Sequence, residues 1–453
     1  MDKKDWEKRV EWIDDYVRRI KPYVRVREKD SLLIKIPNQA WKLNPGGVKL
    51  LAFLLGGGTV MQVLEKYEDK ESISLDVYAF FRDLGALLKG CYDERAPRRA
   101  VEKTPFALPF NQLPVLSEIA LTYRCNLACR FCYASCGCRK DLSSRSGDDS
   151  AKELGTARVK EMIDIIAGEA QIPSLSFTGG EPLLRRDIAE LVAHAKKRGL
   201  WVNLITNGTL ADAGTVAGLK AAGLDSAQVS IEAGEAALHD RIAAVPGAFA
   251  RTLAGVKNFM AAGVRVHTNT TVSALNKDAV EQIAGLVKEL GLKKFSMNML
   301  MPVGTAGVNL EETFISYTEI GPVVERARAR AAALGLEFMW YSPTPVCIYN
   351  PIARGLGNKG CSACDGLLSV APNGDILPCS SYPKPMGNLL EHRGGFAGLW
   401  SSAPFKYFQE KRFAHALCKA CDALAHCNGA CPLYWERAGY KELEAARAAV
   451  PTP

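Results

Sequence analysis

From residue 115 onwards, short apolar runs alternate with segments whose apolar residues recur every three or four positions. The runs predict strands, and the amphipathic segments predict helices. Strands are expected over residues 116–123, 174–178, 201–206, 227–232, 265–272 and 294–299, and helices over 157–170, 186–198, 211–222, 249–262, 278–290 and 317–334. Strands that alternate with helices form a parallel sheet with the helices outside. A closed barrel of this class has about eight such units, so this pattern predicts an α/β fold with a partial (β/α)6 TIM-type barrel.

The N-terminal pattern is different. Residues 1–28 carry apolar side chains at helical spacing and predict one charged amphipathic helix. Two short strands are expected over 32–36 and 40–43, followed by helices over 46–55, 60–67 and 74–88. Asn44 precedes Pro45 and is expected to cap the first of these three helices, because its side chain can accept a free backbone N–H. Strands followed by short helices predict a winged-helix-like domain.

A charged stretch that becomes proline-bearing, residues 93–112, separates the two patterns and is typical of a linker. We therefore expect an N-terminal domain over residues 1–105, a linker to about 113 and a barrel domain over 114–336. A cysteine-rich domain is expected over 337–453.

Composition narrows the class of protein. The formal net charge of +8 is modest for 453 residues and spread along the chain, so it does not indicate nucleic-acid binding. The charged N-terminus predicts no signal peptide, and no apolar run approaches the ~20 residues of a membrane span. The 14 cysteines are clustered, which in a reduced cytoplasmic protein is typical of metal ligands rather than disulfides.

The first barrel strand passes directly into a loop that contains Cys125, Cys129 and Cys132. Three thiolates can hold three corners of a four-iron cluster and leave the fourth iron open to a ligand. The alternatives are a structural zinc site, which usually has four protein ligands, and reduced thiols in the core.

The spacing of these cysteines, with Phe131 before the third, resembles the cluster motif of the radical S-adenosylmethionine (radical SAM) enzymes. The resemblance implies a [4Fe-4S] cluster whose open iron binds S-adenosylmethionine. One electron, supplied by a donor such as ferredoxin or flavodoxin, then cleaves S-adenosylmethionine to a 5'-deoxyadenosyl radical.

The resemblance also implies which residues contact the cofactor. They lie at or after strand ends, where ligands of parallel sheets bind: Gly179, Gly180, Glu181, Asn207, Ser230, Arg241 and Arg251. The Glu181 carboxylate is expected to accept hydrogen bonds from the methionine ammonium group. Either Arg241 or Arg251 is the expected partner of the methionine carboxylate, with a solvated helix face as the alternative for each.

Eight further cysteines follow residue 338: Cys347, Cys361, Cys364, Cys379, Cys418, Cys421, Cys427 and Cys431. Their spacing resembles the SPASM domain, which carries two auxiliary iron-sulfur clusters. This implies an inner cluster on Cys361 or Cys364 with Cys379 and Cys431, and an outer cluster on Cys418, Cys421 and Cys427. The family's last cysteine is missing here, so the outer cluster takes its fourth ligand from an upstream cysteine, a carboxylate such as Glu436, or water, or leaves an iron open. Zinc ribbons are the alternative for the Cys-x2-Cys pairs.

Two features depart from the family pattern. The hydrophilic loop of residues 136–154 adds Cys136 and Cys138, interpreted as idle thiols, with extra ligands or sulfur acceptors as alternatives. In the sulfatase-maturing relatives an aspartate thought to act as a base follows the third cysteine of the field, and here Ser380 stands at that place. The sequence therefore nominates no catalytic side chain beyond the cluster and argues against formylglycine formation.

The N-terminal segment, from Trp41 to Asn44 and again around Phe80 and Phe81, resembles the small peptide chaperone of pyrroloquinoline quinone biosynthesis. That domain is the prototype of leader-peptide recognition elements, and the resemblance implies an edge strand that captures a leader by β-augmentation. The alternatives are a helical domain that packs on the enzyme and a winged helix for DNA. Basic residues are not concentrated on the second helix, which argues against DNA.

Together these resemblances predict a maturase that modifies a ribosomally made peptide with a leader. A first alternative is a maturase of a small-molecule or metallocofactor pathway, of the haem or tungsten-cofactor type. A second is a non-catalytic iron-sulfur scaffold or electron carrier.

Overall fold

The computed structural model describes residues 4–90, 100, 110–136 and 153–448. The chain divides into two compact units, Met1–Val115 and Leu116–Pro453. Most of the expected linker and most of the loop after the core cysteines, Cys138 included, lie outside the described residues. No helix in the described part of the chain is long and apolar enough to cross a membrane.

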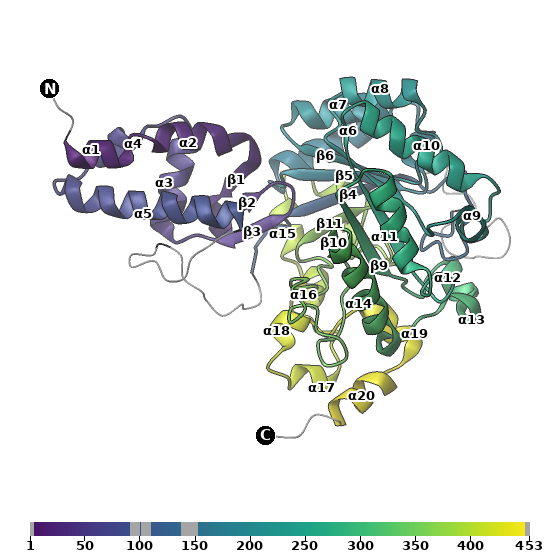
Figure 1. The fold of residues 1–453 in the computed structure, drawn as a ribbon. Coiled ribbons are helices and arrows are strands. Elements are labelled where there is room, and N and C mark those ends of the chain that lie inside the picture. The colour runs from purple at the N-terminus through teal and green to yellow at the C-terminus, as the bar shows by residue number, and fades with distance from the viewer. Residues whose placement is uncertain (1–3, 91–99, 101–109, 137–152, 449–453) are drawn as a thin grey trace. The chain divides into compact units, whose positions relative to one another are not determined.

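The first unit combines a three-stranded antiparallel sheet with helices before and after it (Figure 1). Its elements are α1 (Asp5–Val10), α2 (Ile13–Ile20), β1 (Val24–Arg27), β2 (Leu32–Lys35), β3 (Gln39–Lys42), α3 (Pro45–Leu55), α4 (Val60–Leu64) and α5 (Lys70–Lys89). The strand order is β1-β2-β3, so β3 is an edge strand. As expected, Asn44 caps α3: its Oδ1 accepts a hydrogen bond from the Gly47 N–H at 2.7 Å.

The expectation of one helix over residues 1–28 is wrong. The helical stretch ends at Ile20, because Pro22 has no N–H and disfavours a helical conformation in the residue before it. Beyond the proline, valine and arginine alternate with period two from Val24 to Arg27, and this stretch pairs with β2 as a strand. Val24 is buried in the same core cluster as Leu33 and Phe81.

A ten-stranded sheet forms the centre of the second unit, in the order β10-β9-β8-β7-β6-β5-β4-β11-β12-β13. The strands are β4 (Leu116–Thr122), β5 (Ser174–Gly179), β6 (Trp201–Thr206), β7 (Ser226–Ser230), β8 (Arg265–Val272), β9 (Lys294–Met299), β10 (Glu337–Trp340), β11 (Leu367–Val370), β12 (Asp375–Leu377) and β13 (Gly387–Asn388). All pairs from β10 to β11 are parallel, and the last two pairs are antiparallel. The expected α/β fold with a parallel sheet is confirmed, and its six strands are β4 to β9.

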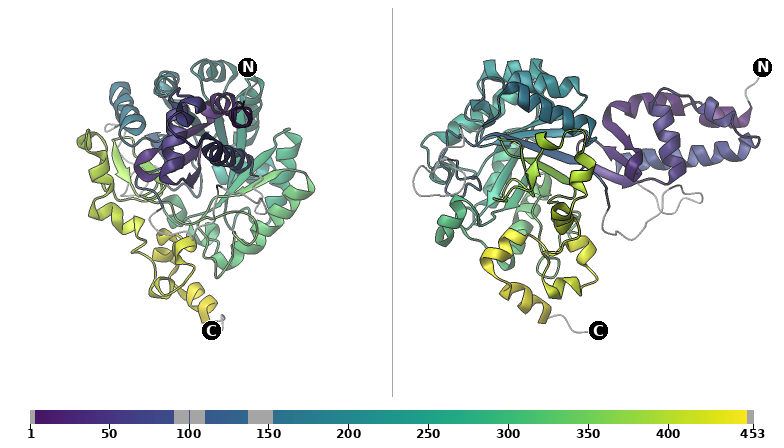
Figure 2. Two further views of the ribbon diagram at one scale, coloured as in Figure 1. Left: turned by 90° about the vertical axis from the view of Figure 1, so that its left-hand side faces the viewer. Right: turned by 180° about the vertical axis from the view of Figure 1, so that it is seen from behind.

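Helices cover the outer face of the parallel strands (Figures 1 and 2). They are α6 (Thr156–Gly168), α7 (Ile188–Lys197), α8 (Ala213–Ala221), α10 (Ala248–Ala261), α11 (Val280–Glu289) and α14 (Tyr317–Ala333). Helices α9 (Ala236–Ala243), α12 (Thr305–Val308) and α13 (Leu310–Thr313) instead lie beside the loop that follows β4. Burial alternates along the strands: in β6, Val202 and Leu204 are buried, whereas Asn203 is half-buried. One face of each strand therefore packs on helices, and the inner face carries polar side chains.

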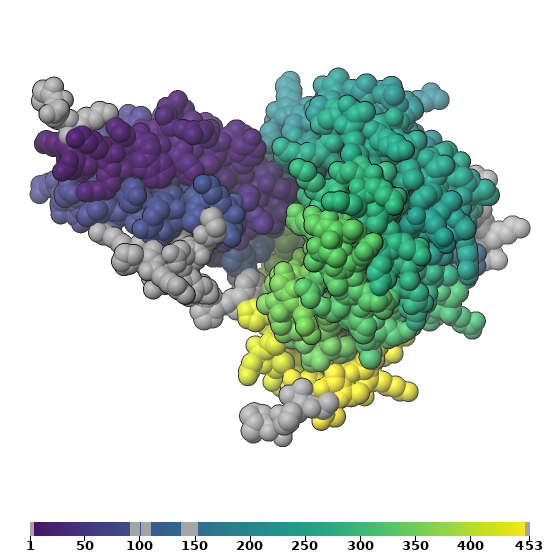
Figure 3. Space-filling view, viewed as in Figure 1, coloured from purple at the N-terminus to yellow at the C-terminus, as the bar shows by residue number. Residues whose placement is uncertain are grey.

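The C-terminal segment extends this sheet at both edges. Strand β10 adds to β9, and β11 adds to β4. Up to residue 448, where the described part of the chain ends, six helices follow: α15 (Phe396–Trp400), α16 (Ala403–Gln409), α17 (Ala416–Lys419), α18 (Leu424–Cys427), α19 (Pro432–Ala438) and α20 (Lys441–Ala448). The surface of the unit continues without a break from the core to these yellow helices (Figure 3). The segments on the two sides of residue 336 share this sheet and belong to one compact unit, so the structure does not separate them there. The domain boundary expected at residue 336 stays a prediction.

Candidate active site and auxiliary metal centres

The loop after β4 places three thiols around one cavity of about 210 Å³ at the C-terminal ends of the barrel strands. Backbone hydrogen bonds fix the loop: the Ala128 N–H donates to Ala243 O at 3.1 Å, and the Thr305 N–H donates to Cys132 O at 2.9 Å. The structure thus brings together the three expected cluster ligands, Cys125, Cys129 and Cys132.

The donor set fits a cluster better than a single ion. In the described part of the chain, no three His, Cys, Asp or Glu side chains are grouped so as to hold one metal ion. Three thiols around an open cavity suit an iron-sulfur cluster with a free corner, whereas a structural zinc ion usually has four protein ligands. Cys136 also lines the cavity, and hydrogen bonding from its thiol lowers the pKa of the Cys132 thiol to about 7. Burial raises the pKa of the Cys125 thiol to about 11 and the pKa of Cys129 well above its usual value, so of these three thiols Cys132 alone is shifted toward the thiolate, the form that binds metal.

The Gly179-Gly180 backbone packs directly against the start of the cysteine loop. The Gly180 N–H donates to Thr122 O at 2.7 Å. A Cβ at Gly179 would lie 2.2 Å from Thr122 O, and one at Gly180 would lie 2.2 Å from Arg124 O. Since both oxygens belong to the backbone, these positions accept only glycine. Both glycines line the cavity, so their backbone groups face a bound ligand.

The Glu181 side chain does not line the cavity. It is fully buried, and its carboxylate accepts hydrogen bonds from the Leu183 N–H at 2.9 Å, the Asn207 N–H at 2.8 Å and the Thr206 hydroxyl at 2.7 Å. Burial raises its pKa to about 7. These three donors come from the chain itself, and the expectation that the carboxylate also receives a cofactor ammonium group stays a prediction. Glu181 joins the loops after β5 and β6.

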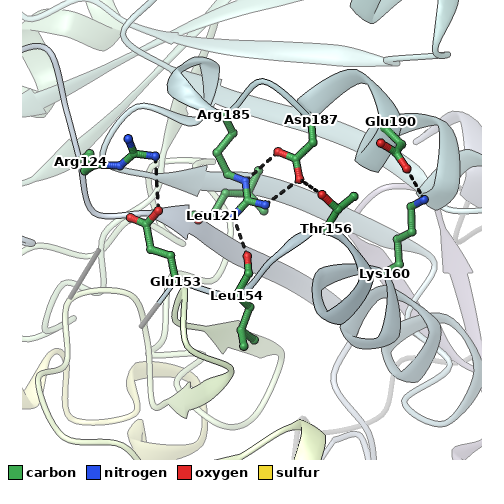
Figure 4. Close-up of polar contacts among 9 residues, drawn as sticks. All are labelled: Leu121, Arg124, Glu153, Leu154, Thr156, Lys160, Arg185, Asp187 and Glu190. Carbon is green, nitrogen blue, oxygen red and sulfur yellow. Dashed lines mark hydrogen bonds and ion pairs between the residues drawn. The ribbon is translucent and has the colours of Figure 1, made fainter. Parts of the chain in front are cut away.

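A second polar network fastens the segment after β5 to strand β4 (Figure 4). Arg185 donates two hydrogen bonds to Asp187, at 2.9 and 2.6 Å, and further bonds to Leu121 O at 3.3 Å and Leu154 O at 2.9 Å. The Thr156 hydroxyl donates to the same Asp187 carboxylate at 2.7 Å. A bidentate pair of this kind holds its geometry well, so the network positions the glycine loop relative to the cysteine loop.

Asn207 and Ser230 line the cavity, as expected, whereas Arg241 and Arg251 do not. The Asn207 side-chain nitrogen donates to Asn126 Oδ1 at 2.9 Å and lies 3.8 Å from Cys125 Sγ. Arg241 and Arg251 are exposed on α9 and α10, which corresponds to the solvated-face alternative. The expectation that one of them meets the methionine carboxylate stays a prediction, which this placement does not support.

Several polar residues of the cavity were missing from the predicted site, among them Glu232, His239, Thr271 and Asn298. Glu232 accepts a hydrogen bond from the Thr271 N–H at 2.9 Å, and burial raises its pKa to about 8. The Glu232 N–H donates to His239 Nδ1 at 3.2 Å, so the proton of the neutral ring is on Nε2. Burial lowers the His239 pKa to about 4. Glu232 lies two residues after Ser230, so strand periodicity gave a signal for it; nothing local marked His239.

The eight C-terminal cysteines form two groups of four. The outer group lines one cavity: Cys347, Cys418, Cys421 and Cys427. In the inner group the thiolates of three members each interact with that of Cys361, and these members are Cys364, Cys379 and Cys431. The inner group therefore includes both cysteines between which the sequence left a choice. Glu436 is not among the residues of the outer cavity and accepts a hydrogen bond from the Tyr382 hydroxyl at 3.4 Å.

Glu118, on β4, is a half-buried carboxylate close to both the cavity wall and the inner cysteines. It accepts a hydrogen bond from the Ser369 hydroxyl at 2.6 Å and others from Ser380, and burial raises its pKa. The negative charge of Glu118 contributes to raising the pKa of Tyr133, which lines the cavity, and the pKa of Cys379 in the inner group. A carboxylate thus lies beside Ser380, where the sequence indicated no acid. Glu118 was missed because it stands in the middle of a strand, outside any motif.

Comparison with known proteins agrees with this geometry. Residues 119–290 match the radical SAM superfamily, and residues 361–422 match an iron-sulfur cluster-binding domain, SPASM. An AdoMet-dependent heme synthase of Methanosarcina barkeri is 30% identical over 337 residues, which cover 70% of this chain and 90% of that protein. A PqqA peptide cyclase of Methylocella silvestris is 30% identical over 322 residues, which cover 69% and 80%.

The fold is similar to that of Streptococcus suis SuiB, in a crystal structure with its precursor peptide SuiA. The TM-score is 0.65 at 17% identity, with 91% of this chain and 94% of that chain covered. The cofactors of such a fold are S-adenosylmethionine, a [4Fe-4S] cluster and auxiliary iron-sulfur clusters. The chain is an enzyme that belongs to the radical SAM superfamily and carries a C-terminal SPASM domain.

Proposed function

We propose that the enzyme is a peptide maturase, which binds the leader of a ribosomally made peptide on residues 1–105 and modifies the peptide at the 210 Å³ cavity. The peptide cyclase relative and the fold shared with a peptide-bound enzyme support this proposal. When bound at Cys125, Cys129 and Cys132, the cluster and S-adenosylmethionine supply hydrogen abstraction by a radical. A donor such as ferredoxin or flavodoxin provides the electron. Gly179, Gly180, Asn207 and Ser230 orient the cofactor.

The observation that carries the proposal is the open edge of β3. Among the described strands, β3 pairs with β2 and with no other. The Leu43 N–H donates to Ser31 O at 2.8 Å. In the register of β2 and β3, residues 39 and 41 therefore also turn their backbone N–H and C=O groups toward β2. Hydrogen bonding alternates along an antiparallel pair, so the N–H and C=O groups of Ala40 and Lys42 face outward. An extended leader can add there as a fourth strand.

Replacement of Ala40 by proline tests this interaction. Ala40→Pro removes one outward N–H and leaves the ladder with β2 intact, because proline is tolerated on the open side of an edge strand. We expect the dissociation constant of the leader to rise at least about tenfold, which corresponds to roughly 1.4 kcal/mol. The measurement is fluorescence anisotropy with the labelled leader of a candidate precursor peptide. Ala40→Val, which keeps the N–H, is the matched control, and equal affinity of the two variants contradicts the proposal.

A second candidate is maturation of a small-molecule or metallocofactor, of the haem or tungsten-cofactor type. It is favoured by the heme synthase relative, of which 90% is covered. Deletion of residues 1–105 separates the two. Under the first candidate, the deletion variant still cleaves S-adenosylmethionine but no longer changes the mass of the co-expressed peptide. Under the second, turnover of the small molecule is unchanged by the deletion.

A further inference from the structure

The outer auxiliary group contains a thiol that the family spacing does not place there. The spacing supplies Cys418, Cys421 and Cys427 and lacks the cysteine expected after Cys431. Cys347 comes from the opposite direction of the chain, on the segment between β10 and β11, and lines the same cavity as the other three. Cys347, which precedes all the other C-terminal cysteines in the sequence, thus takes the place of the family's last cysteine, which follows them.

The surroundings of this group suit a cluster and offer no competing ligand. Apart from the four thiols, the cavity is lined by apolar residues and Arg447, and no Asp, Glu or His of the described chain is among them. The Arg447 guanidinium donates to Cys421 Sγ at 3.5 Å, which places a cation against the thiolates. The carboxylate alternative, Glu436, is engaged with Tyr382. Cys347 is therefore the available fourth donor.

The inner group is complete without Cys347. Its four thiols interact with one another, and the Cys431 N–H donates to Tyr317 Oη at 3.3 Å. Lys411 is buried and donates to Cys361 O at 2.8 Å, which fixes the backbone of a second member. Neither group needs a ligand from the other, so the eight cysteines suffice for two four-iron clusters.

We propose that Cys347 is the fourth ligand of the outer auxiliary cluster. Both auxiliary clusters are then closed by four cysteines of this chain, and neither offers an iron to substrate. Among the described cysteines, the set that leaves an open corner is the loop of Cys125, Cys129 and Cys132. The proposal depends on the clusters of the family and not on the identity of the substrate.

The test uses the full-length chain reconstituted anaerobically with ⁵⁷Fe, with iron analysis, Mössbauer and EPR spectroscopy as readouts. Wild type is expected to hold about twelve irons in three clusters. In Cys347→Ala we expect a loss of about one to four irons, with the EPR signal of a three-iron cluster where only one iron is lost. Cys347→Asp, which restores a ligand, should keep the four-iron cluster with shifted g-values. A merely structural cysteine would show no such rescue.

Two further measurements make the outcome unambiguous. The change that S-adenosylmethionine causes in the core-cluster signal should persist in both Cys347 variants, which shows that they are folded. Glu436→Gln is the matched control and should leave iron content and spectra unchanged. The proposal is overturned if Cys347→Ala retains wild-type iron and spectra, or if Glu436→Gln loses iron instead. It is also overturned if cyanide perturbs more than one cluster of the wild-type chain.

Discussion

At the scale of single residues, burial sets the charge state of the polar groups inside the barrel. Glu181 and Glu232 are almost inaccessible, and burial raises their pKa values to about 7 and about 8. Burial lowers the pKa values of His239 and His267 to about 4. All four shifts favour the neutral form, because a low-dielectric interior disfavours charge. Of the four, Glu232 and His239 line the cavity, so both of these groups are shifted toward the neutral form there.

His267, on β8, gives a pH prediction. Its Nε2 lies 3.1 Å from Gln228 Oε1, and burial together with Lys294 lowers its pKa to about 4 from 6.5. Between these two values the unfolded chain binds more protons than the folded chain, so the stability contributed by His267 is lost as pH falls from 6.5 through 4. His267→Gln removes this dependence. Between pH 7 and 4 the wild type should lose on the order of 2 kcal/mol more than the variant.

Urea denaturation at a series of pH values measures this difference. His392→Gln, at an exposed position, is the matched control and should follow the wild-type profile. Parallel profiles for wild type and His267→Gln would show that this histidine is not held neutral.

At the scale of elements, the site depends on contact between loops that follow different strands. The loop after β5 bonds to the cysteine loop through its backbone, and Glu181 joins it to the loop after β6. Two glycines make this contact close enough, since a side chain at either would collide with a backbone oxygen. The glycines are thus needed for the arrangement of the thiols as well as for access to a cofactor.

Gly180→Ala tests this dependence. The added Cβ would meet Arg124 O at 2.2 Å and must displace the residues next to Cys125. We expect the variant to lose about four of its irons, those of the core cluster, and to keep the auxiliary clusters. Iron analysis and the loss of the S-adenosylmethionine-dependent EPR change measure the effect. Gly285→Ala, in α11 where no atom lies within 4 Å of the new Cβ, should keep all irons.

At the scale of the whole molecule, the barrel and the cysteine field form one unit, separate from residues 1–115. The C-terminal segment supplies strands to both edges of the parallel core, β10 beside β9 and β11 beside β4. The Tyr317 N–H, at the start of α14, donates to the Tyr434 hydroxyl at 3.1 Å and adds a further link. Parallel sheets are stable when their faces and edges are covered.

A truncation tests this unity. A fragment of residues 110–336 lacks β10 to β13, so β9 and β4 become open edges. We expect it to aggregate, whereas a fragment of residues 110–453 remains monomeric and folded. Size-exclusion chromatography and circular dichroism compare the two fragments, and a monomeric, cooperatively folding shorter fragment would contradict the prediction.

Much of this architecture could be predicted from local patterns. The six strands β4 to β9 and six of the covering helices follow the periodicity of apolar residues, because one-sided burial imposes a period on the sequence. The three thiols of the core loop are seven residues apart at most and could be recognised by spacing. The prediction of one helix over residues 1–28 was wrong because Pro22 interrupts the helical spacing of apolar residues and a stretch with period two, typical of a strand, follows it.

Local sequence patterns were enough to predict the succession of elements and the kinds of metal and hydrogen-bond donor that the chain offers. The tertiary structure decided which of them meet: Cys347 with the outer cysteines, Glu118 with Ser380, and β11 with β4. It also decided that Glu181 is turned to Thr206 and Asn207, and that Arg241 and Arg251 lie on the surface. Periodicity reports which face of an element is buried, but partners distant in the sequence leave no periodic signal. Their meeting depends on how the strands are ordered in the sheet.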